Sequence, residues 1–244
     1  MTSFPPTSVE PIDDMESVFF AREWEFAVQR RDDIDRHWNE LLAQKPLLYD
    51  GIVLLIDRCE ILQRDGRRVL STRHFPTRYR NFLAWRDFGF PDASVRNCFA
   101  AAALMSADSA FVLGEMAAHT ANAGRVYFAA GTPDMGDVNG SSVDLTGSIL
   151  RELTEETGIG ADEVVCADDW SVIFEGPRVG CMKIVRSPLA ADPLVARIET
   201  FLAGDENAEL ARMHVVRSAA DLKADAMPDF IIAYLQGLLE RVSS

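Results

Sequence analysis

Glu152, Glu155 and Glu156 lie within five residues of one another, and Arg151 stands directly before them. If this segment is helical, with about 100° between successive residues, Glu156 lies about 40° to one side of Glu152 and Glu155 about 60° to the other. The three carboxylates then share one stripe of the helix, where they repel one another and no lysine offsets them. Oxygen ligands at this density favour Mg²⁺ or Mn²⁺, which also bind substrate phosphates.

The neighbouring residues suit a helix that holds such ligands in place. Ile149, Leu150 and Leu153 fall on the adjacent face and can anchor the helix in a core. Arg151 can reach Glu155 one turn further on, or a carboxylate from the preceding loop, and so orient the ligands. An exposed acidic helix with a single Arg–Glu pair would show the same short pattern, so the residues around it must decide.

Residues 151–159 read Arg-Glu-Leu-Thr-Glu-Glu-Thr-Gly-Ile, and this run resembles the second half of the Nudix box, R-E-U-x-E-E-x-G-U, where U is aliphatic. Upstream, residues 128–137 resemble the loop that opens the box, with Gly131 six residues before Asp137. Asp stands there where the family has Glu, and thirteen residues rather than seven separate Asp137 from Arg151. Because the extra six residues enlarge the loop around 138–143, either Asp137 or Asp144 could supply the loop carboxylate.

The resemblance implies an α+β fold, the Nudix α/β/α sandwich, over residues 95–244, with an N-terminal α/β extension over residues 1–94 that contributes to substrate binding. It also implies Mg²⁺- or Mn²⁺-dependent hydrolysis of a nucleoside diphosphate linked to a group X. Glu152, Glu155 and Glu156 would be metal ligands and would act in catalysis with Arg151. Gly131 and Asp137 would lie against the substrate.

The general base is open at this stage, because Nudix enzymes draw it from different places. Glu152 is one candidate. Three acids that follow a later helix are others, although a solvated loop is the simpler interpretation for them: Asp205, Glu206 and Glu209.

Segments of the N-terminal part indicate a substrate by their resemblance to a particular Nudix branch. Four segments are similar to a Nudix branch that hydrolyses UDP-glucose and UDP-galactose to UMP and a sugar 1-phosphate: residues 24–26, 34–38, 45–51 and 79–83. A UDP-sugar is therefore the leading expected substrate. The alternatives are ADP-ribose or another ADP-sugar, an NTP, and a nucleotide sensor that binds without cleaving. Arg78 and Arg80 are candidate substrate-binding residues because guanidinium groups suit phosphate oxygens, although a solvated helix face would look the same.

The 244-residue chain has a net charge of −14, which argues against nucleic-acid or anionic-membrane partners. It does not argue against a phosphorylated small molecule, because a metal ion can carry the phosphate contact. No run approaches the roughly 20 apolar residues of a membrane helix. The four cysteines form no C-x-x-C pair, which predicts reduced thiols. We expect a cytoplasmic monomer or homodimer.

The elements that must position these residues follow from periodicity and caps. Asp144 can begin a helix over 145–157 that ends at Gly158. Further helices are predicted over 31–43, 79–88, 194–202 and 228–242. Strands are predicted over 24–28, 51–56, 60–62, 69–72, 98–105, 110–115, 125–128, 164–174, 179–186 and 213–216, and the first dozen residues are expected to form a loose arm. This order indicates a mixed sheet covered by helices rather than regular βαβ winding.

Overall fold

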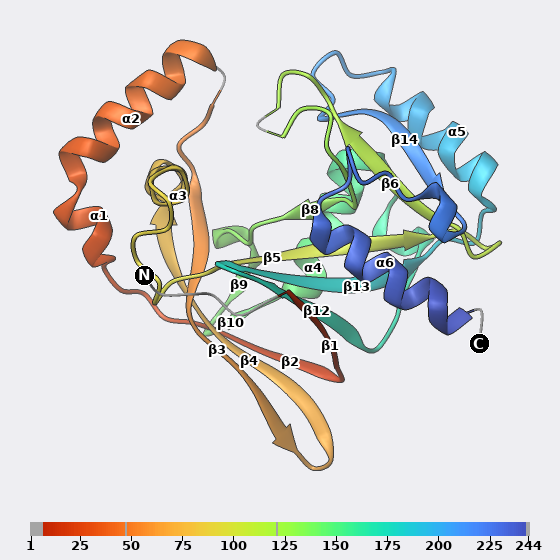
Figure 1. Cartoon of the computed structure of the whole chain (residues 1–244), viewed down its shortest axis with the longest axis horizontal. Coiled ribbons are helices and arrows are strands. Elements are labelled where there is room, and N and C mark those ends of the chain that lie inside the picture. Colours follow the sequence, from red (N-terminus) through yellow and green to blue (C-terminus); the bar gives the residue numbers. More distant parts are fainter. Residues whose placement is uncertain (1–6, 47, 121, 243–244) are drawn as a thin grey trace.

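Two β-sheets carry the fold of the computed structural model, which describes residues 7–46, 48–120 and 122–242 (Figure 1). The larger sheet has the strand order β1-β12-β13-β5-β6-β14, and the smaller has the order β3-β4-β2-β10-β9. Strands β13 and β5 run parallel, as do β2 and β4, so both sheets are mixed. No helix among the described residues is long and apolar enough to cross a membrane.

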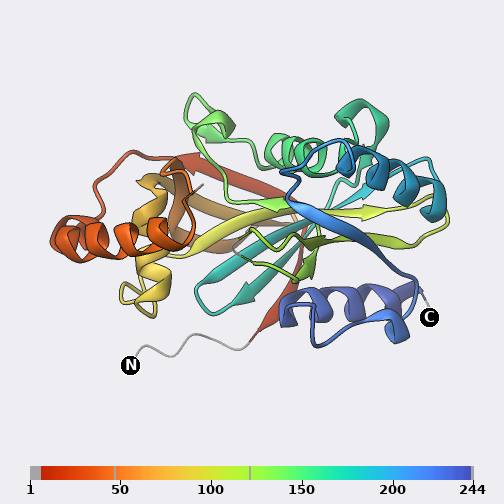
Figure 2. The same ribbon diagram turned by 90° about the horizontal axis from the view of Figure 1, so that it is seen from above.

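The larger sheet lies between helices on both of its faces (Figure 2). Helices α4 (Leu145–Thr157) and α5 (Ala191–Leu202) cover one face, and α6 (Asp229–Val242) covers the other. The main strands of this sheet are β1 (Ser8–Ile12), β5 (Asn97–Met105), β6 (Phe111–Met116), β12 (Trp170–Glu175), β13 (Arg178–Arg186) and β14 (Leu210–Val216). The short strands β7 (Val126–Tyr127), β8 (Ala130–Gly131) and β11 (Val165–Cys166) pair beside them. The predicted α+β class, a mixed sheet between helices, is confirmed.

Successive side chains of β5 point to opposite faces of the larger sheet and so contribute to the hydrophobic core on each face. Cys98, Ala100 and Ala102 face the side of α4 and α5, where Ile149 and Leu153 are fully buried. Ala101 faces the side of α6, with Ile231. Because successive strand residues point to opposite faces, both layers pack on the same strand.

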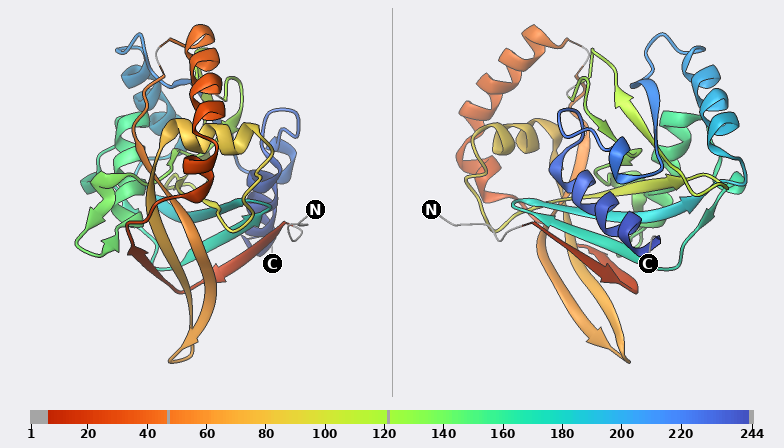
Figure 3. Two further views of the ribbon diagram at one scale, coloured as in Figure 1. Left: turned by 90° about the vertical axis from the view of Figure 1, so that its left-hand side faces the viewer. Right: turned by 45° about the vertical axis from the view of Figure 1, so that its right-hand side comes forward.

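The N-terminal part forms the smaller sheet and a group of helices beside it. Its strands are β2 (Asp14–Phe19), β3 (Ile52–Arg64) and β4 (Arg67–Arg78), and its helices are α1 (Glu25–Gln29), α2 (Arg31–Gln44) and α3 (Tyr79–Asp87). The β3–β4 hairpin turns at Asp65-Gly66 and projects beyond the rest of the fold (Figure 3). Trp24, Ile34 and Trp85 form a separate core under these helices.

Several predicted elements differ from the structure. Residues 8–12 are not a loose arm but form β1, which pairs with β12 and buries Ile12. The segment 24–28 is not a strand but the start of α1. Trp24 and Phe26 are buried while Val28 is 49 % exposed, so the alternating pattern did not mark one buried strand face. The two strands predicted over 51–62 are a single strand, β3, with a bulge between Ile56 and Arg58.

The insertion in the box forms a hairpin of its own. Strands β9 (Val138–Asn139) and β10 (Ser142–Val143) pair with each other, and Ser142 of β10 pairs with Val18 of β2. The extra residues of the box thus extend the N-terminal sheet, while β1 from the N-terminal part joins the larger sheet. Strands from residues 1–94 therefore pair with strands from residues 95–244 in both sheets: β1 with β12, and β2 with β10. The division into domains 1–94 and 95–244 stays a proposal.

Candidate active site

Helix α4 is held at both ends by the residues that the sequence predicts. The Asp144 side chain accepts a hydrogen bond of 2.9 Å from the Gly147 amide, and Gly158 follows the helix with a φ of 70°. An L-residue with a side chain rarely adopts that φ, which is why glycine suits the position. The buried residues Ile149 and Leu153 fix the rotation of α4, so the adjacent stripe faces the edge of β8.

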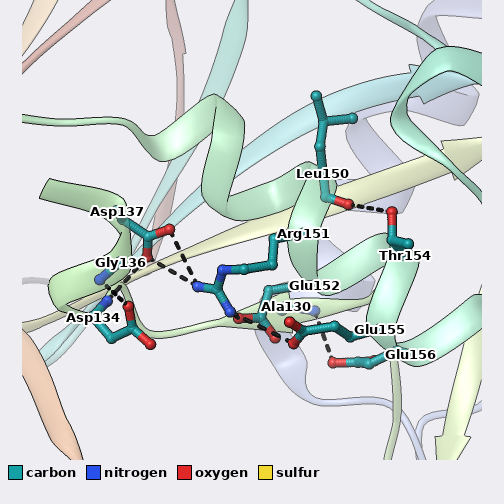
Figure 4. A network of polar contacts seen from close by, with 10 residues as sticks. All are labelled: Ala130, Asp134, Gly136, Asp137, Leu150, Arg151, Glu152, Thr154, Glu155 and Glu156. Atoms are coloured by element: carbon teal, nitrogen blue, oxygen red, sulfur yellow. Dashed lines mark hydrogen bonds and ion pairs between the residues drawn. The ribbon is translucent and has the colours of Figure 1, made fainter. Parts of the chain in front are cut away.

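That stripe carries the three glutamates, which cluster beside Ala130 (Figure 4). Glu156 is 8 % exposed, whereas the side chains of Glu152 and Glu155 are 17 % and 61 % exposed. The Ala130 amide lies 3.4 Å from Glu156 Oε1 and donates to it. The structure thus brings together all three predicted ligands. Glu156 is buried, Glu152 is partly buried and Glu155 lies at the surface.

Arg151 connects the stripe to the preceding loop (Figure 4). Its guanidinium donates to Asp137 over 3.0 Å and to Glu152 over 2.8 Å, and lies 3.6 Å from Glu155 Oε2. A charged donor shared among three carboxylates offsets part of their repulsion and orients them. Arg151 therefore reaches both the following glutamates and a loop carboxylate, and its role in positioning them stays a prediction.

The loop carboxylate that meets Arg151 is Asp137. Its side chain is 4 % exposed and also accepts a hydrogen bond of 3.0 Å from the Asp134 amide, in the short 3-10 turn Met135–Asp137. Asp144 instead caps α4. The geometry favours Asp137 over Asp144 for the position that the box Glu takes.

Asp137→Asn should therefore lower kcat/KM by about ten- to a hundredfold, because neutralising an outer carboxylate loosens the ligands that it orients. Asp144→Asn should keep near-normal activity, since Asn caps helices as well as Asp does. Steady-state kinetics at saturating Mg²⁺ would measure both. Equal losses in the two variants would contradict the assignment of Asp137.

Burial makes the two inner carboxylates hard to ionise in the absence of a cation. Burial, then the neighbouring Glu155 and Asp137, raise the pKa of Glu152 to about 7 despite the opposing effect of Arg151. Burial, then the Glu152 and Glu209 carboxylates, raise the pKa of Glu156 to about 8. A divalent cation would reverse this, because it favours the charged form of each ligand.

The donor set fits a hard cation, although the side chains do not yet surround one. Among the described residues, no three His, Cys, Asp or Glu side chains converge on a common point. Glu156 Oε2 is nevertheless buried without a hydrogen-bond partner, which is costly unless something pairs with it. Arg151 now occupies oxygens of Glu152 and Asp137, so cation binding requires some of these side chains to turn. Mg²⁺ or Mn²⁺ suits oxygen ligands of this kind.

Gly131 packs closely against the carboxyl group of Glu152. A Cβ at this position would overlap the carboxyl group of Glu152. Gly131 therefore lies against the glutamate stripe, and its lack of a side chain leaves room for Glu152; its predicted contact with the substrate stays a prediction.

Two pockets flank the β8 segment that carries Gly131. We call the first, of about 310 Å³ beside α6, the helix-side pocket; it is lined by Asn97, Phe99, Asn122, Arg125, Tyr127 and Arg178, with Phe230 and Gly131. We call the second, of about 450 Å³ beside the box loop, the loop-side pocket; it is lined by Tyr49, Gly51, Tyr79, Asp134, Met135 and Gly136, with Ile52 and Val53. Thr132 borders both pockets.

The structure does not bring every predicted residue to this place. Arg78 and Arg80 line another pocket, beside α1 and α2, and their guanidinium groups pair with Asp50 and Asp35. Neither lines the two pockets beside the glutamates, so their role in substrate binding stays a prediction that this geometry does not favour.

The later acids are separated in the same way. Asp205 and Glu206 line a pocket between α5 and β14 with His119. Glu209, just before β14, is the acid whose charge acts on the pKa of Glu156 and on the pKa of the Tyr127 phenol.

Sequence reasoning missed most of the helix-side pocket. Asn97, Arg125, Arg178 and Phe230 come from four distant parts of the chain and meet only because β5, β7, β13 and α6 lie side by side. No local pattern marks them. Tyr79 does lie in a segment that the sequence singled out, but on the strength of resemblance alone.

No family model matches the sequence, and no curated protein matches it either. Solved structures do. A Nudix hydrolase from M. smegmatis aligns with 14 % identity and a TM-score of 0.41 over 61 % of this chain and 86 % of its own. A C. elegans Ap4A hydrolase aligns with 15 % identity and a TM-score of 0.41 over 59 % of this chain and 95 % of its own. A MutT protein from Methanosarcina mazei Go1 aligns with 15 % identity and a TM-score of 0.40 over 61 % of this chain and 96 % of its own.

Proposed function

We propose that the chain is a Mg²⁺- or Mn²⁺-dependent pyrophosphohydrolase of the Nudix type. The observation that supports this most directly is the buried, unpartnered Oε2 of Glu156 within a carboxylate set that Arg151 orients. An ordinary acidic helix would leave these groups in water. Burying two of them against β8 makes physical sense if a cation binds there.

The residues of the site would divide the work of hydrolysis. Glu152, Glu155 and Glu156 would hold the cation, which when bound offsets charge on the diphosphate and favours ionisation of the attacking water. Arg151 would hold the carboxylates of Glu152 and Asp137 in fixed positions through the hydrogen bonds that its guanidinium donates to both. The two acids with raised pKa values, Glu152 and Glu156, would release protons as the cation binds.

The helix-side pocket suits the nucleoside part of the substrate. Phe99 and Phe230, whose ring centroids are 5.5 Å apart, offer apolar surface to a base. Asn97 and Asn122 offer amide donors and acceptors, and Arg125 offers positive charge for phosphate oxygens. Arg178 also lines the pocket but pairs with Glu175 over 2.8 Å.

A UDP-sugar, cleaved to UMP and a sugar 1-phosphate, remains the leading candidate substrate. ADP-ribose, another ADP-sugar or an NTP would use the same carboxylates. A nucleotide sensor that does not cleave is the second candidate function, and the retained acidic residues weigh against it. We further propose that the protein acts in the cytoplasm, as a monomer or homodimer, on a small molecule rather than on nucleic acid or a membrane.

Incubating the purified protein with Mg²⁺ and a panel of UDP-sugars, ADP-ribose, dinucleotides and NTPs tests this function. We expect turnover of at least one nucleoside diphosphate derivative, and none in EDTA. If nothing in the panel were turned over while calorimetry showed tight nucleotide binding, the sensor would be favoured instead. Turnover of ADP-ribose but not of UDP-sugars would reject the UDP-sugar as the substrate and leave the proposed hydrolase function standing.

Among the later acids, Glu209 is the best candidate for the general base, because it is the one that acts electrostatically on Glu156. Glu209→Gln should lower kcat by about a hundredfold, as loss of a general base typically does. Glu206→Gln is the matched control and should stay near wild type, since Glu206 lines the pocket between α5 and β14. Similar kcat values for both variants would point back to Glu152.

A further inference from the structure

Strand β3 of the N-terminal part contacts the box loop along its outer edge. Val53 forms a bridge pair with Asp134, and the Leu54 amide donates to the Pro133 carbonyl over 2.7 Å. Leu54 is fully buried and Pro133 is buried as well, so this contact lies inside the fold. The N-terminal part therefore reaches the box loop through backbone groups, whose positions do not depend on mobile side chains.

The larger sheet holds the beginning of the same loop. The short strand β8 pairs with β5, and the Thr132 hydroxyl donates to Asn97 Oδ1 over 3.2 Å. Strand β3 is itself tied to this sheet, because the Ile56 and Arg96 backbone groups hydrogen-bond to each other in both directions, over 3.0 and 2.9 Å. Within residues 130–134 the loop thus passes from the larger sheet to the smaller one, and it is held by both.

Asp134 stands where the loop leaves β3 and turns towards the glutamates (Figure 4). Its side chain accepts a hydrogen bond of 2.6 Å from the Gly136 amide, and its own amide donates to the Asp137 carboxylate over 3.0 Å. The Asp137 amide donates in turn to the Asp134 carbonyl over 3.2 Å. These reciprocal contacts close the 3-10 turn and fix both the backbone and the side chain of Asp137.

The buried carboxylate of Asp137 passes this order on to helix α4. Both of its oxygens accept hydrogen bonds from the Arg151 guanidinium, over 3.2 and 3.0 Å, and its carbonyl accepts from the Asp144 amide over 2.8 Å. An Arg151 side chain released from Asp137 would pair with the glutamates alone. It would then compete with a cation for their oxygens.

We infer that β3 is a support of the metal site, and that Asp134 is a positioning residue through which this support reaches Asp137 and Arg151. The inference rests on the proposed hydrolase function, because the glutamates that Arg151 contacts are the proposed cation ligands. Asp134 acts through Asp137 and has no need to touch the cation. The N-terminal part would then contribute to cation binding even before a substrate arrives.

Manganese binding to the full chain tests the role of Asp134 without any substrate. Asp134→Ala removes the acceptor for the Gly136 amide and should weaken Mn²⁺ binding, measured by calorimetry, by about tenfold, as loss of a residue that orients metal ligands does. Asp134→Asn should stay within about threefold of wild type, because Asn caps a turn of this kind as well as Asp does.

Ser218→Ala is the matched control. Ser218 begins the 3-10 turn Ala219–Asp221, and its amide makes the same kind of contact with a carboxylate, over 2.8 Å to Asp221. That turn packs on α6 and β14, so the substitution should leave Mn²⁺ binding unchanged.

Two outcomes would overturn the role of Asp134. An equal loss of affinity in Asp134→Asn and Asp134→Ala would show that the charge of Asp134 matters rather than its hydrogen bond. Wild-type Mn²⁺ affinity in Asp134→Ala, with or without a raised KM for a nucleotide, would show that the turn does not position the site. If the tenfold loss appears and no compound of the substrate panel is hydrolysed, the hydrolase proposal fails and the positioning role stands.

Hydrogen exchange on the unaltered protein tests the part played by β3. Saturating Mg²⁺ should slow exchange in residues 52–56 and 133–137 together, by about tenfold or more, because cation binding stabilises the state in which their hydrogen bonds are made. Residues 60–64, at the projecting end of β3, are the internal control and should exchange at the same rate with and without Mg²⁺. Slowing in 133–137 alone would overturn the support by β3.

Discussion

Glu156→Gln is expected to reduce metal-dependent hydrolysis by at least about a hundredfold and, in the same variant, to stabilise the metal-free protein. The activity should fall because Glu156, as a proposed metal ligand, loses its charge. The stability rises because the buried carboxylate, whose pKa is raised to about 8, is replaced by a neutral group of similar volume. A gain of about 1 kcal/mol would raise Tm by roughly 2–4 °C in a chain of this size. Thermal unfolding in EDTA at pH 8 measures it.

The pH dependence of this difference has a defined sign. Because the folded state holds a proton on Glu152 and Glu156 up to about pH 7 and 8, stability falls as pH rises from about 4.5 through those values. The Tm gap between Glu156→Gln and wild type should therefore widen from pH 5 to pH 8. Saturating Mg²⁺ should close it by stabilising only wild type.

Glu155→Gln is the matched control for this pair of effects. Its side chain is 61 % exposed, so the substitution should cost activity, by orders of magnitude if Glu155 is a ligand, without the gain in stability. A Glu156→Gln variant that is less stable than wild type at pH 8 in EDTA would contradict the account of the buried carboxylate.

Gly131→Ala is the second substitution for which we expect a large effect. The new methyl group would overlap the Glu152 carboxyl group, so Glu152 must leave its place beside Arg151. We expect kcat/KM to fall by about a hundredfold or more, as small displacements in a site can cause, together with weaker activation by Mg²⁺.

Gly237→Ala is its control, because nothing lies within 4 Å of a Cβ there, and it should retain wild-type kinetics. Titration of activity with Mg²⁺ measures both variants. Normal Mg²⁺ activation of Gly131→Ala would show that Glu152 is not held by this contact.

The parts of the site that lie close together in sequence were predictable. Asp144 and Gly158 mark the ends of α4, and the spacing of Ile149 and Leu153 sets which face is buried. Helical geometry then places the glutamates on one stripe. Local chemistry was sufficient here because each contact spans only a few residues.

The parts that depend on strand pairing were not predictable. Nothing in residues 8–12 indicates that β12, more than 150 residues away, will pair with them. The choice between Asp137 and Asp144 depended on which one the Arg151 side chain reaches. Arg78 and Arg80 suggested phosphate binding, but the fold gives them Asp50 and Asp35 as partners.

The pairing of β10 with β2 has a consequence for how such a chain can change over evolution. The hairpin inserted in the box completes the edge of the N-terminal sheet, and Asp137, which orients Arg151, directly precedes it. Loss of the N-terminal part would leave an unpaired strand edge at the loop that sets the catalytic carboxylates. Shortening the box would likewise leave β2 with β4 as its one remaining neighbour in the sheet. The two segments therefore depend on each other in the fold, and we expect that exchanging one without the other would disturb the loop that holds Asp137.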